Sequence, residues 1–316
     1  MKALIIGGGG FVGGYLKDYL ISQEIDVYIT KLPSQQINNN NKAFTFNLDI
    51  LDFNQISNLL KEINPDYIFH LAAQSSVSVS WVKPALTADV NIKGCINLLE
   101  AVRSLNINPR ILIIGSAEEY GKPNINKNRG SIISETSAIN PCNIYAATKA
   151  CQNMIGTIYS NAYNMNLIMV RAFNHFGPKQ EPTFVVADFC KQVAEIEKNL
   201  KEPVIKVGNL KAKRDFTDVR DVVKAYFALI KSGIKGETYN VGSGKAVGIN
   251  EILDIILSMS TAQIKISVDK NKFRPIDVPI IKADISKIVN HTKWSPSLDI
   301  KTTIEDTLNY FRNNIC

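Results

Sequence analysis

Short apolar runs alternate with helix-like stretches through the first half of the chain, and this alternation constrains the fold more than any other feature. The apolar runs are expected to be strands at residues 2–7, 26–30, 43–47, 66–72, 110–115 and 167–173. The stretches expected to be helices lie at residues 11–23, 52–62, 85–106 and 142–163. Strands that are apolar at every position are buried on both faces, as in a parallel sheet covered by helices. The pattern therefore predicts an α/β fold with a Rossmann-type, doubly wound parallel sheet.

The regularity weakens after residue 173. Helices are expected near residues 182–200, 219–232, 249–260 and 301–313, and strands near 204–207 and 238–242. A chain of 316 residues exceeds the usual size of a single core, so a second part is expected. We predict a Rossmann domain at residues 1–173, to which residues of about 208–242 return, and a smaller C-terminal α/β lobe formed mainly by residues 174–316.

The composition is typical of soluble globular proteins. Apolar residues make up 45% of the chain and charged residues 21%, and no run approaches the roughly 18 apolar residues of a membrane span. The apolar run at the N-terminus is too short for the core of a signal peptide. The cytoplasm is therefore the expected compartment.

Charge and cysteine content exclude several other classes. The net charge is +7, but Lys and Arg are spread along the chain without a basic block. This distribution argues against nucleic acid and fits an anionic small substrate. The five cysteines show neither CxxC spacing nor a nearby histidine cluster, so we expect reduced thiols and no metal site.

A glycine-rich turn directly follows the first predicted strand and opens the first predicted helix. It reads "IIGGGGFVGGYL" and supplies Gly7, Gly10 and Gly13. Such glycines allow a tight turn, close approach of backbone amides to a pyrophosphate and close packing of helix on strand, while the helix N-terminus faces the anion. A turn of this kind can be purely structural, but its place at the first strand-to-helix junction predicts a bound dinucleotide.

The choice between NADP and NAD depends on the end of the second predicted strand. NAD-binding chains place an acidic residue there for the adenosine ribose, whereas this strand ends "VYITKLPS". Lys31 can pair with a 2′-phosphate, which favours NADP(H); NAD(H) stays open, because Lys31 can also point to water. Asp49 is expected at the adenine amino group. The candidate cofactor-binding residues are Gly7, Gly10, Phe11, Val12, Gly13, Lys31, Asp49, Ile50, Leu71, Ala72, Ala73, Tyr145 and Lys149.

The stretch "NIYAATKA" places Tyr145 and Lys149 on one face of a predicted helix. Ser116 lies at the tip of the fifth predicted strand. Together these residues can support hydride transfer at a carbonyl. Tyrosine exchanges a proton with the substrate oxygen, lysine lowers the pKa of that phenol and holds the nicotinamide ribose, and serine bonds the same oxygen. The same spacing arises by chance in many helices, but with the glycine turn and Ser116 it predicts an enzyme.

A fourth candidate for the catalytic set lies beside Ser116. The run "IIGSAEEYG" ends a buried strand with a hydroxyl group and two carboxylates, of which Glu118 is the candidate catalytic group. If Glu118 is a base, a dehydratase is expected; if it only forms hydrogen bonds, a reductase is expected. These residues alone leave both alternatives open.

Taken together, these motifs resemble the extended short-chain dehydrogenase/reductase family, also called the NAD-dependent epimerase/dehydratase family, over essentially the whole chain. Supporting stretches are "HLAAQSS" at 70–76, "NIKG" at 91–94 and "RAFNHFGPKQ" at 171–180. The second half is similar to the nucleotide-sugar branch that handles GDP-mannose derivatives. The similar stretches there lie at residues 188–198, 207–226, 239–244 and 273–279.

The resemblance implies a GDP-sugar substrate bound mainly by the C-terminal lobe. The substrate-binding residues that it implies are Ser75, Asn174, Lys191, Asn209, Arg214 and Arg274. Guanidinium groups bind phosphate bidentately and an amide can read a base edge, which agrees with a GDP moiety. By contrast, we expect Arg220 and Asp221 to form a surface ion pair.

Two features separate the reactions of this branch. The mannose dehydratase has a hydroxyl residue, a serine and a glutamate at the strand end, where this chain has Ser116, Ala117 and Glu118. It also has an Arg-rich insertion after the second strand, whereas the loop here, "KLPSQQINNNNKA", is short and lacks arginine. The resemblance therefore implies NADPH-dependent reduction of the C4 ketone of GDP-4-keto-6-deoxy-D-mannose to GDP-D-rhamnose.

Other functions remain as alternatives. One is GDP-mannose 4,6-dehydratase or another nucleotide-sugar epimerase or dehydratase. Another is a non-catalytic regulator that senses a dinucleotide, although such proteins typically lose the Tyr or the Lys that this chain retains. The family usually dimerises through two long helices, here 85–106 and 142–163, so the resemblance also implies a homodimer built on a four-helix bundle.

Overall fold

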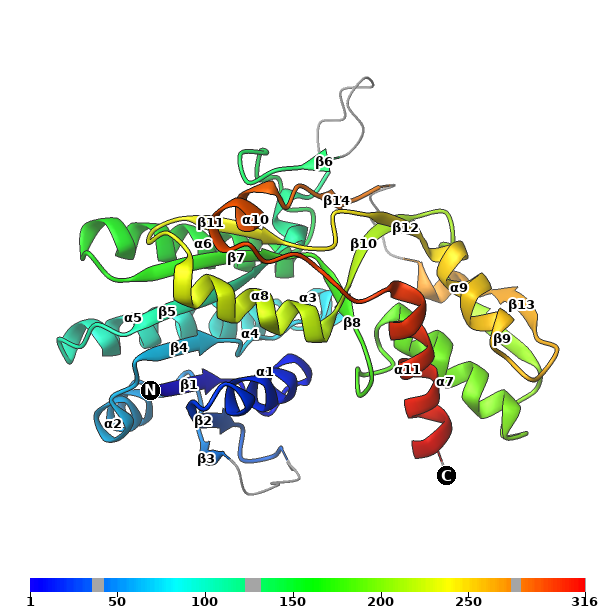
Figure 1. Ribbon diagram of the computed structural model, residues 1–316, viewed down its shortest axis with the longest axis horizontal. Coiled ribbons are helices and arrows are strands. Elements are labelled where there is room, and N and C mark those ends of the chain that lie inside the picture. Colours follow the sequence, from blue (N-terminus) through cyan, green and yellow to red (C-terminus); the bar gives the residue numbers. More distant parts are fainter. Residues whose placement is uncertain (36–42, 123–131, 274–279, 316) are drawn as a thin grey trace.

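A computed structural model describes residues 1–35, 43–122, 132–273 and 280–315 of the chain. Its largest element is a seven-stranded sheet in the order β11-β7-β5-β4-β1-β2-β3 (Figure 1). The strands are β1 (Lys2–Ile6), β2 (Asp26–Lys31), β3 (Phe44–Asn47), β4 (Tyr67–His70), β5 (Arg110–Ser116), β7 (Leu167–Ala172) and β11 (Thr238–Val241). Every neighbouring pair is parallel. The predicted α/β fold with a Rossmann-type, doubly wound sheet is confirmed.

The chain enters this sheet near its middle and then fills both sides. From β1 it proceeds to β2 and β3, and afterwards it crosses to β4, β5, β7 and finally β11 on the other side. In open parallel sheets, ligands bind outside the carboxyl ends of the strands where the strand order reverses. Here that point lies between β1 and β4.

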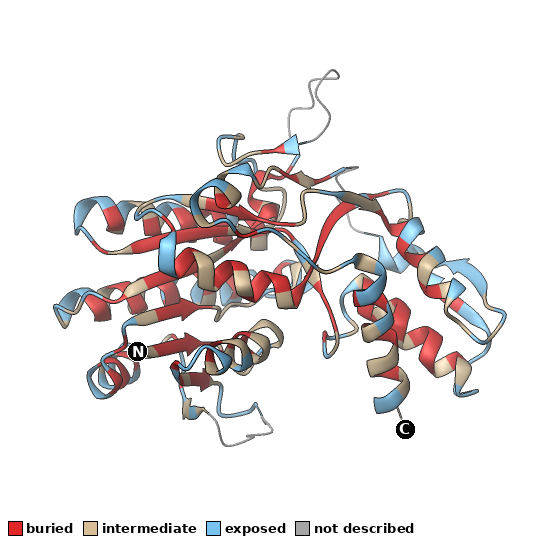
Figure 2. Cartoon of the chain, in the orientation of Figure 1, coloured by how far each residue is buried: buried red, intermediate tan, exposed pale blue. Residues whose placement is uncertain are grey.

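Helices cover both faces of the sheet (Figure 1). The helices α1 (Phe11–Ser22) and α8 (Val219–Ser232) lie on one face, and α2 (Phe53–Ile63), α5 (Gly94–Ser104) and α6 (Ile144–Ala162) lie on the other. In β1, Ala3 and Ile5 join the core beneath α1 and α8, whereas Leu4 and Ile6 join the core beneath α2 and α5. Both faces of the strand are therefore buried (Figure 2), which explains why it is apolar at every position.

The C-terminal lobe has its own core and only short strands. A three-stranded sheet contains β8 (Asn174–Phe176), β10 (Lys213–Asp218) and β12 (Ala246–Gly248), and β9 (Val204–Val207) pairs with β13 (Lys265–Val268). The helices α7 (Val185–Glu197), α9 (Ile249–Ser258) and α11 (Ile300–Asn314) pack around a common apolar cluster. A further short pair joins β6 (Ile132–Ile133) to β14 (Lys282–Ala283).

The division into residues 1–173 and 174–316 remains a prediction. The structure shows one further segment that returns to the large sheet and was not predicted to do so. Besides α8 and β11, the late helix α10 (Ser286–Thr292) packs on the large sheet, where it contacts α8 and β11. Within the described ranges, no helix is long and apolar enough to cross a membrane.

The stretch predicted as one helix at residues 85–106 is interrupted. It consists of α4 (Pro84–Ala88), a π-helical turn (Asp89–Lys93) and α5, and it follows a helix that was not predicted, α3 (Val77–Val82). The π-helical turn carries Asn91, whose side chain bonds the backbone of Gln74 and Thr148 Oγ1 of α6. Such wider turns often occur at functional sites, and this one ties the loop after β4 to α6.

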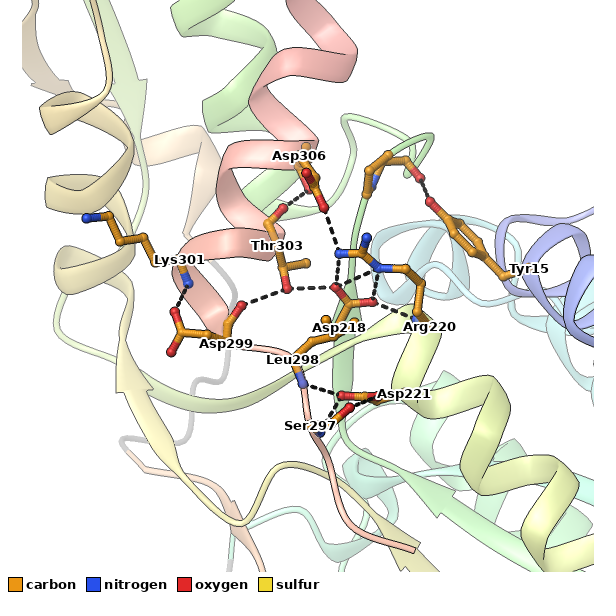
Figure 3. A network of polar contacts seen from close by, with 12 residues as sticks. Tyr15, Asp218, Arg220, Asp221, Ser297, Leu298, Asp299, Lys301, Thr303 and Asp306 are labelled. Atoms are coloured by element: carbon orange, nitrogen blue, oxygen red, sulfur yellow. Dashed lines mark hydrogen bonds and ion pairs between the residues drawn. The ribbon is translucent and has the colours of Figure 1, made fainter.

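A polar network fastens α11 to the start of α8 (Figure 3). Asp218 caps α8 by accepting a hydrogen bond from the Arg220 amide at 2.6 Å, and it accepts another from Thr303 Oγ1 of α11 at 2.7 Å. Arg220 forms ion pairs with Asp218 at 2.6 Å and with Asp306 of α11 at 2.8 Å. The network therefore joins the C-terminal lobe to a helix of the large sheet.

Asp221 lies in the same region but faces another partner. It is 1% exposed and accepts hydrogen bonds from the backbone amides of Ser297 and Leu298, both at 2.7 Å. The predicted surface ion pair between Arg220 and Asp221 is therefore wrong. Arg220 turns to two other carboxylates, while Asp221 satisfies the backbone of the segment that leads into α11.

Candidate active site

One large cavity connects the carboxyl ends of the large sheet with the C-terminal lobe. Its volume is about 1110 Å³. It brings together most of the residues that the sequence nominated from distant parts of the chain. Those residues are Gly7, Gly10, Phe11, Val12, Gly13, Lys31, Asp49, Ile50, Leu71, Ala72, Ala73, Ser75, Ser116, Glu118, Tyr145, Lys149, Asn174, Asn209 and Arg214.

Two nominated substrate residues are not in this set. Lys191 does not line the cavity; its ammonium group lies 3.7 Å from Glu195 on the same helix. Asp188, one turn earlier in α7, lines the cavity, as do Val185, Val186 and Phe189. Arg274 lies outside the described residues, but its neighbours Lys272 and Phe273 line the cavity.

The glycine turn at the end of β1 leaves room for an anion. Gly7 has φ +86°, and a Cβ atom there would lie 2.7 Å from the backbone nitrogen of Ala72. A Cβ on Gly13 would lie 2.6 Å from the backbone of Gly8, so this glycine permits close packing of α1. Gly10 is the N-cap of α1 and makes no side-chain cap. The amides of the first helical turn therefore remain for a ligand phosphate, and the turn fits the pyrophosphate of a dinucleotide.

The second strand ends beside the region expected for the adenosine ribose. Lys31 lines the cavity, and its Nζ donates a hydrogen bond to the Gln35 backbone oxygen at 2.6 Å. Asp49 lines the cavity from the loop after β3 and accepts a hydrogen bond from the Leu51 amide at 2.9 Å. Both side chains are at the rim, where either can move to meet a cofactor.

Ser116, Tyr145 and Lys149 converge where β5 ends beside α6. Asn143 caps α6 by accepting a hydrogen bond from the Ala146 amide at 2.8 Å, which fixes the start of the helix that carries Tyr145 and Lys149. The Tyr145 hydroxyl is hydrogen-bonded to the Ser116 side chain. Lys149 is 3% exposed and donates to the Ile114 backbone oxygen at 2.7 Å. The three polar groups expected for hydride transfer therefore lie together.

Burial has the largest influence on the pKa values of Tyr145 and Lys149. It raises the pKa of Tyr145; the hydrogen bond with Ser116 opposes the rise, and the carboxylates of Glu118 and Glu119 add to it. Burial also lowers the pKa of Lys149 to about 8. The sequence predicted that Lys149 would lower the pKa of Tyr145, but its ammonium group instead bonds the β5 backbone and Gln152. In this site Tyr145 is a protonated phenol, ready to give a proton.

The two adjacent glutamates have different surroundings. A turn of 3₁₀-helix at Ala117–Tyr120 buries Glu119 completely, and its carboxylate accepts bonds from the Ser116 amide at 2.8 Å and from Arg171 Nε at 3.0 Å. A Cβ on Gly115 would lie 2.3 Å from this carboxylate, so the glycine makes room for it. Glu118 instead lines the cavity and accepts a hydrogen bond from Asn143 Nδ2 at 3.2 Å. Glu119 is therefore bonded within the tip of β5, and Glu118 faces the cavity.

Several cavity residues were not found from the sequence. They are Cys142, Asn143, His175, Gln180, Asp188 and Tyr226. Asn143 had a usable signal, because an asparagine directly before a predicted helix is a preferred N-cap. For Asp188 of α7 and Tyr226 of α8, no local sequence pattern indicates that the residue reaches the same cavity as the tip of β5. The same holds for Cys142, His175 and Gln180.

Comparisons with known proteins agree with this geometry. A family model described as GDP-mannose 4,6 dehydratase matches residues 4–307. The chain is 27% identical to GDP-6-deoxy-D-mannose reductase of Pseudomonas aeruginosa, over 99% of this chain and 98% of that protein. It is 30% identical to GDP-mannose 4,6 dehydratase 1 of Arabidopsis thaliana, over 96% of this chain and 87% of that protein.

Solved structures show the same fold over the full length. The structure of RMD from Pseudomonas aeruginosa complexed with NADPH has a TM-score of 0.88 at 27% identity, and 100% of each chain is covered. UDP-glucose 4-epimerase of Thermus thermophilus, in complex with NAD, has the same TM-score and coverage at 26% identity. A nicotinamide dinucleotide cofactor therefore fits both the glycine turn and the relatives. The chain belongs to the GDP-mannose 4,6-dehydratase-like branch of the extended short-chain dehydrogenase/reductase family, whose members are NAD(P)-dependent enzymes of nucleotide sugars.

Proposed function

We propose that this enzyme reduces the C4 ketone of GDP-4-keto-6-deoxy-D-mannose to GDP-D-rhamnose with NADPH. The observation that carries the proposal is the separation of the two glutamates after β5. Elimination of water across C5 and C6 needs an acid and a base beyond Tyr145, Lys149 and Ser116. Beside these residues Glu118 lines the cavity, whereas Glu119 is fully buried and paired with Arg171 at 3.0 Å, and Ala117 carries no polar group. A reduction needs no further groups.

In the proposed reaction, Ser116 and Tyr145 both donate hydrogen bonds to the C4 ketone oxygen. A bound nicotinamide, when reduced, supplies the hydride that C4 receives. Tyr145 gives its proton to the oxygen as the C4 alcohol forms, which balances the two-electron reduction. Lys149, whose pKa is lowered to about 8 by burial, is placed to hold the nicotinamide ribose, and a solvent proton afterwards restores the Tyr145 phenol.

The proposed substrate residues divide between sugar and nucleotide. Ser75 and Asn174 line the cavity beside the catalytic group and suit the sugar and its phosphate. Asn209 and Arg214 line its other end, within the C-terminal lobe, and suit the GDP moiety. Arg274 stays in the proposal on sequence grounds, whereas Lys191 is removed because its side chain does not line the cavity.

We further propose NADPH rather than NADH as the donor. Lys31 provides a cation at the rim where a 2′-phosphate would lie. One relative is named GDP-6-deoxy-D-mannose reductase, and one similar solved structure, RMD from Pseudomonas aeruginosa, is complexed with NADPH. Because NADPH and nucleotide sugars are cytoplasmic metabolites, the cytoplasm is the proposed compartment.

We also propose a homodimer that pairs the α4–α5 stretch and α6 with their copies. Met154 and Ile158, one turn apart on α6, are 63% and 58% exposed. Val82 at the end of α3 and Leu86 within α4 are 79% and 43% exposed. Large apolar side chains gathered on neighbouring helices are typical of an interface. The mass in solution of wild type and Ile158→Asp tests this: the variant is expected to be monomeric, and an unchanged dimer would contradict the proposed surface.

The second candidate function is a GDP-mannose 4,6-dehydratase, which the position of Glu118 in the cavity favours. One assay separates the two reactions. Purified enzyme is given NADPH with freshly made GDP-4-keto-6-deoxy-D-mannose and, in parallel, GDP-mannose alone. Oxidation of NADPH in the first vessel supports the reductase. Formation of the 4-keto-6-deoxy sugar from GDP-mannose, with no net consumption of NADPH, would replace it with the dehydratase.

A further inference from the structure

Tyr226 of α8 has a buried hydroxyl group that finds no partner among the described residues. The residue is 0% exposed and borders the large cavity. Its hydroxyl makes no hydrogen bond to any group in the part of the chain that the structure describes. A buried hydroxyl that stays unpaired costs free energy, so native proteins usually supply a partner. Because this side chain borders a ligand cavity, a bound ligand is the obvious source of that partner.

The position of Tyr226 identifies the part of the cavity that it serves. α8 packs on the α1 face of the large sheet, whereas Tyr145 belongs to α6 on the opposite face. Tyr226 nevertheless packs in the core cluster that contains Val170 and Ala172 of β7, and α8 contacts β5. Both phenols line the cavity. The two side chains therefore approach the tips of β5 and β7 from opposite faces of the sheet. This is the catalytic end of the cavity, far along the sheet from Lys31 at the end of β2.

The chemistry of the two phenols differs. The hydroxyl groups of Tyr145 and Ser116 are hydrogen-bonded to each other and serve the substrate oxygen. Burial raises the pKa of Tyr226, so its hydroxyl stays protonated and needs an acceptor. On a nicotinamide ring, N1 has no free lone pair and C4 carries the hydride. The carboxamide oxygen is the acceptor that the ring offers.

We propose that Tyr226 is a positioning residue that donates a hydrogen bond to the carboxamide oxygen of the bound nicotinamide. This bond holds the ring in one of the two orientations about its glycosidic bond, and so decides which face of C4 is turned towards Tyr145 and the substrate. The proposal rests on the nicotinamide cofactor and not on the identity of the sugar. It therefore stands or falls separately from the reductase assignment.

The test measures cofactor binding without any sugar. Tyr226→Phe removes one oxygen atom and keeps the ring that fills the core. Dissociation constants are measured by calorimetry for NADP⁺, for thio-NADP⁺, in which sulfur replaces the carboxamide oxygen, and for 2′-phospho-ADP-ribose, which lacks nicotinamide. Wild type should prefer NADP⁺ to thio-NADP⁺, because sulfur is the weaker acceptor. The variant should bind NADP⁺ about 2- to 12-fold more weakly, lose that preference, and bind 2′-phospho-ADP-ribose as wild type does.

The control is Tyr19→Phe on the neighbouring helix α1. Tyr19 packs against Phe227 of α8 and does not line the cavity, so all three constants should stay at their wild-type values. Equal weakening of all three ligands by Tyr226→Phe would indicate a general structural role and overturn the proposal. So would an unchanged NADP⁺ constant, or a preference for NADP⁺ over thio-NADP⁺ that survives in the variant.

Discussion

The edge of the large sheet and the C-terminal lobe contribute to one cavity, but they are built differently. At the sheet edge, Ser116 is the last residue of β5 and the glycine turn follows β1, and both strands bury side chains on both faces. In the lobe, cavity residues come from separate short elements, and β13 is exposed along its whole length. A rigid edge suits chemistry that demands fixed distances, whereas a lobe of short elements can change its contacts between substrates. We therefore expect the reaction to take place at the sheet edge and substrate choice to depend on the lobe.

The largest expected effect tests the chemistry of the sheet edge. Tyr145→Phe removes the group that gives the proton while the ring stays in place. Turnover with the keto sugar should fall about 10²- to 10⁴-fold, the usual contribution of a general acid, while the dissociation constant of NADPH changes little. Steady-state kinetics and calorimetry measure the two quantities. Activity near the wild-type level would rule out this mechanism.

The next prediction compares the stability of the two regions. Arg171→Met leaves the fully buried Glu119 carboxylate without its cation, so the free energy of unfolding should fall by about 3–5 kcal/mol. Arg220→Met breaks the pairs that fasten α11, but Arg220 is 35% exposed and the loss should be smaller. Chemical denaturation followed by circular dichroism measures both. Arg103→Met is the control, since its pair with Glu100 is exposed to solvent and should contribute little to the free energy of unfolding.

The same difference explains how much of the molecule could be predicted. The parallel sheet, the glycine turn and the Ser116, Tyr145 and Lys149 set follow from local patterns, because burial on both faces and a strand-to-helix turn leave direct marks in the sequence. The sequence nominated Glu118, but it did not show that Glu119 is buried and paired with Arg171, since only the 3₁₀ turn decides which of the two is buried. Contacts between the lobe and the rest of the chain depend on packing between distant segments. That is why the pair of Arg220 with Asp221 was predicted incorrectly, since their partners lie at residues 297–306. For the same reason the sequence does not show that Lys191 lies outside the cavity lining.

A substitution in the lobe should affect binding and spare the chemistry. Arg214 is 8% exposed and lines the cavity, so Arg214→Met should raise the KM for the GDP-sugar about 10- to 150-fold, the value of a hydrogen bond to a charged group. The kcat at saturation should change little. Lys191→Met is the matched control, because its side chain does not reach the cavity and both constants should keep their wild-type values. An effect confined to kcat would mean that Arg214 takes part in the chemical step. It would contradict the expectation that the lobe acts only in substrate binding.

A smaller effect is expected at the rim of the sheet edge. Wild type should bind NADPH more tightly than NADH, and Lys31→Ala should reduce this preference by about 1 kcal/mol or less, because the contact with the 2′-phosphate is exposed to solvent. Fluorescence titration gives both dissociation constants. Lys61→Ala, on the distant helix α2, should leave the preference unchanged. Equal affinities of wild type for NADPH and NADH would contradict the proposed contact between Lys31 and the 2′-phosphate.

The smallest effect is expected at Glu118, where the two candidate reactions diverge. In a reductase, Tyr145 and Ser116 complete the reaction with the hydride donor, and Glu118 only accepts a hydrogen bond such as that from Asn143 at 3.2 Å. Glu118→Gln keeps an oxygen that can accept this bond, so reduction of the keto sugar should stay within a few-fold of wild type. In a dehydratase, the same change removes the base that takes the C5 proton, and activity with GDP-mannose should fall by orders of magnitude. The substitution leaves the shape of the side chain unchanged. A large loss of ketone reduction would therefore show that Glu118 takes part in proton transfer, and the catalytic residues at the sheet edge would then include more than Ser116, Tyr145 and Lys149.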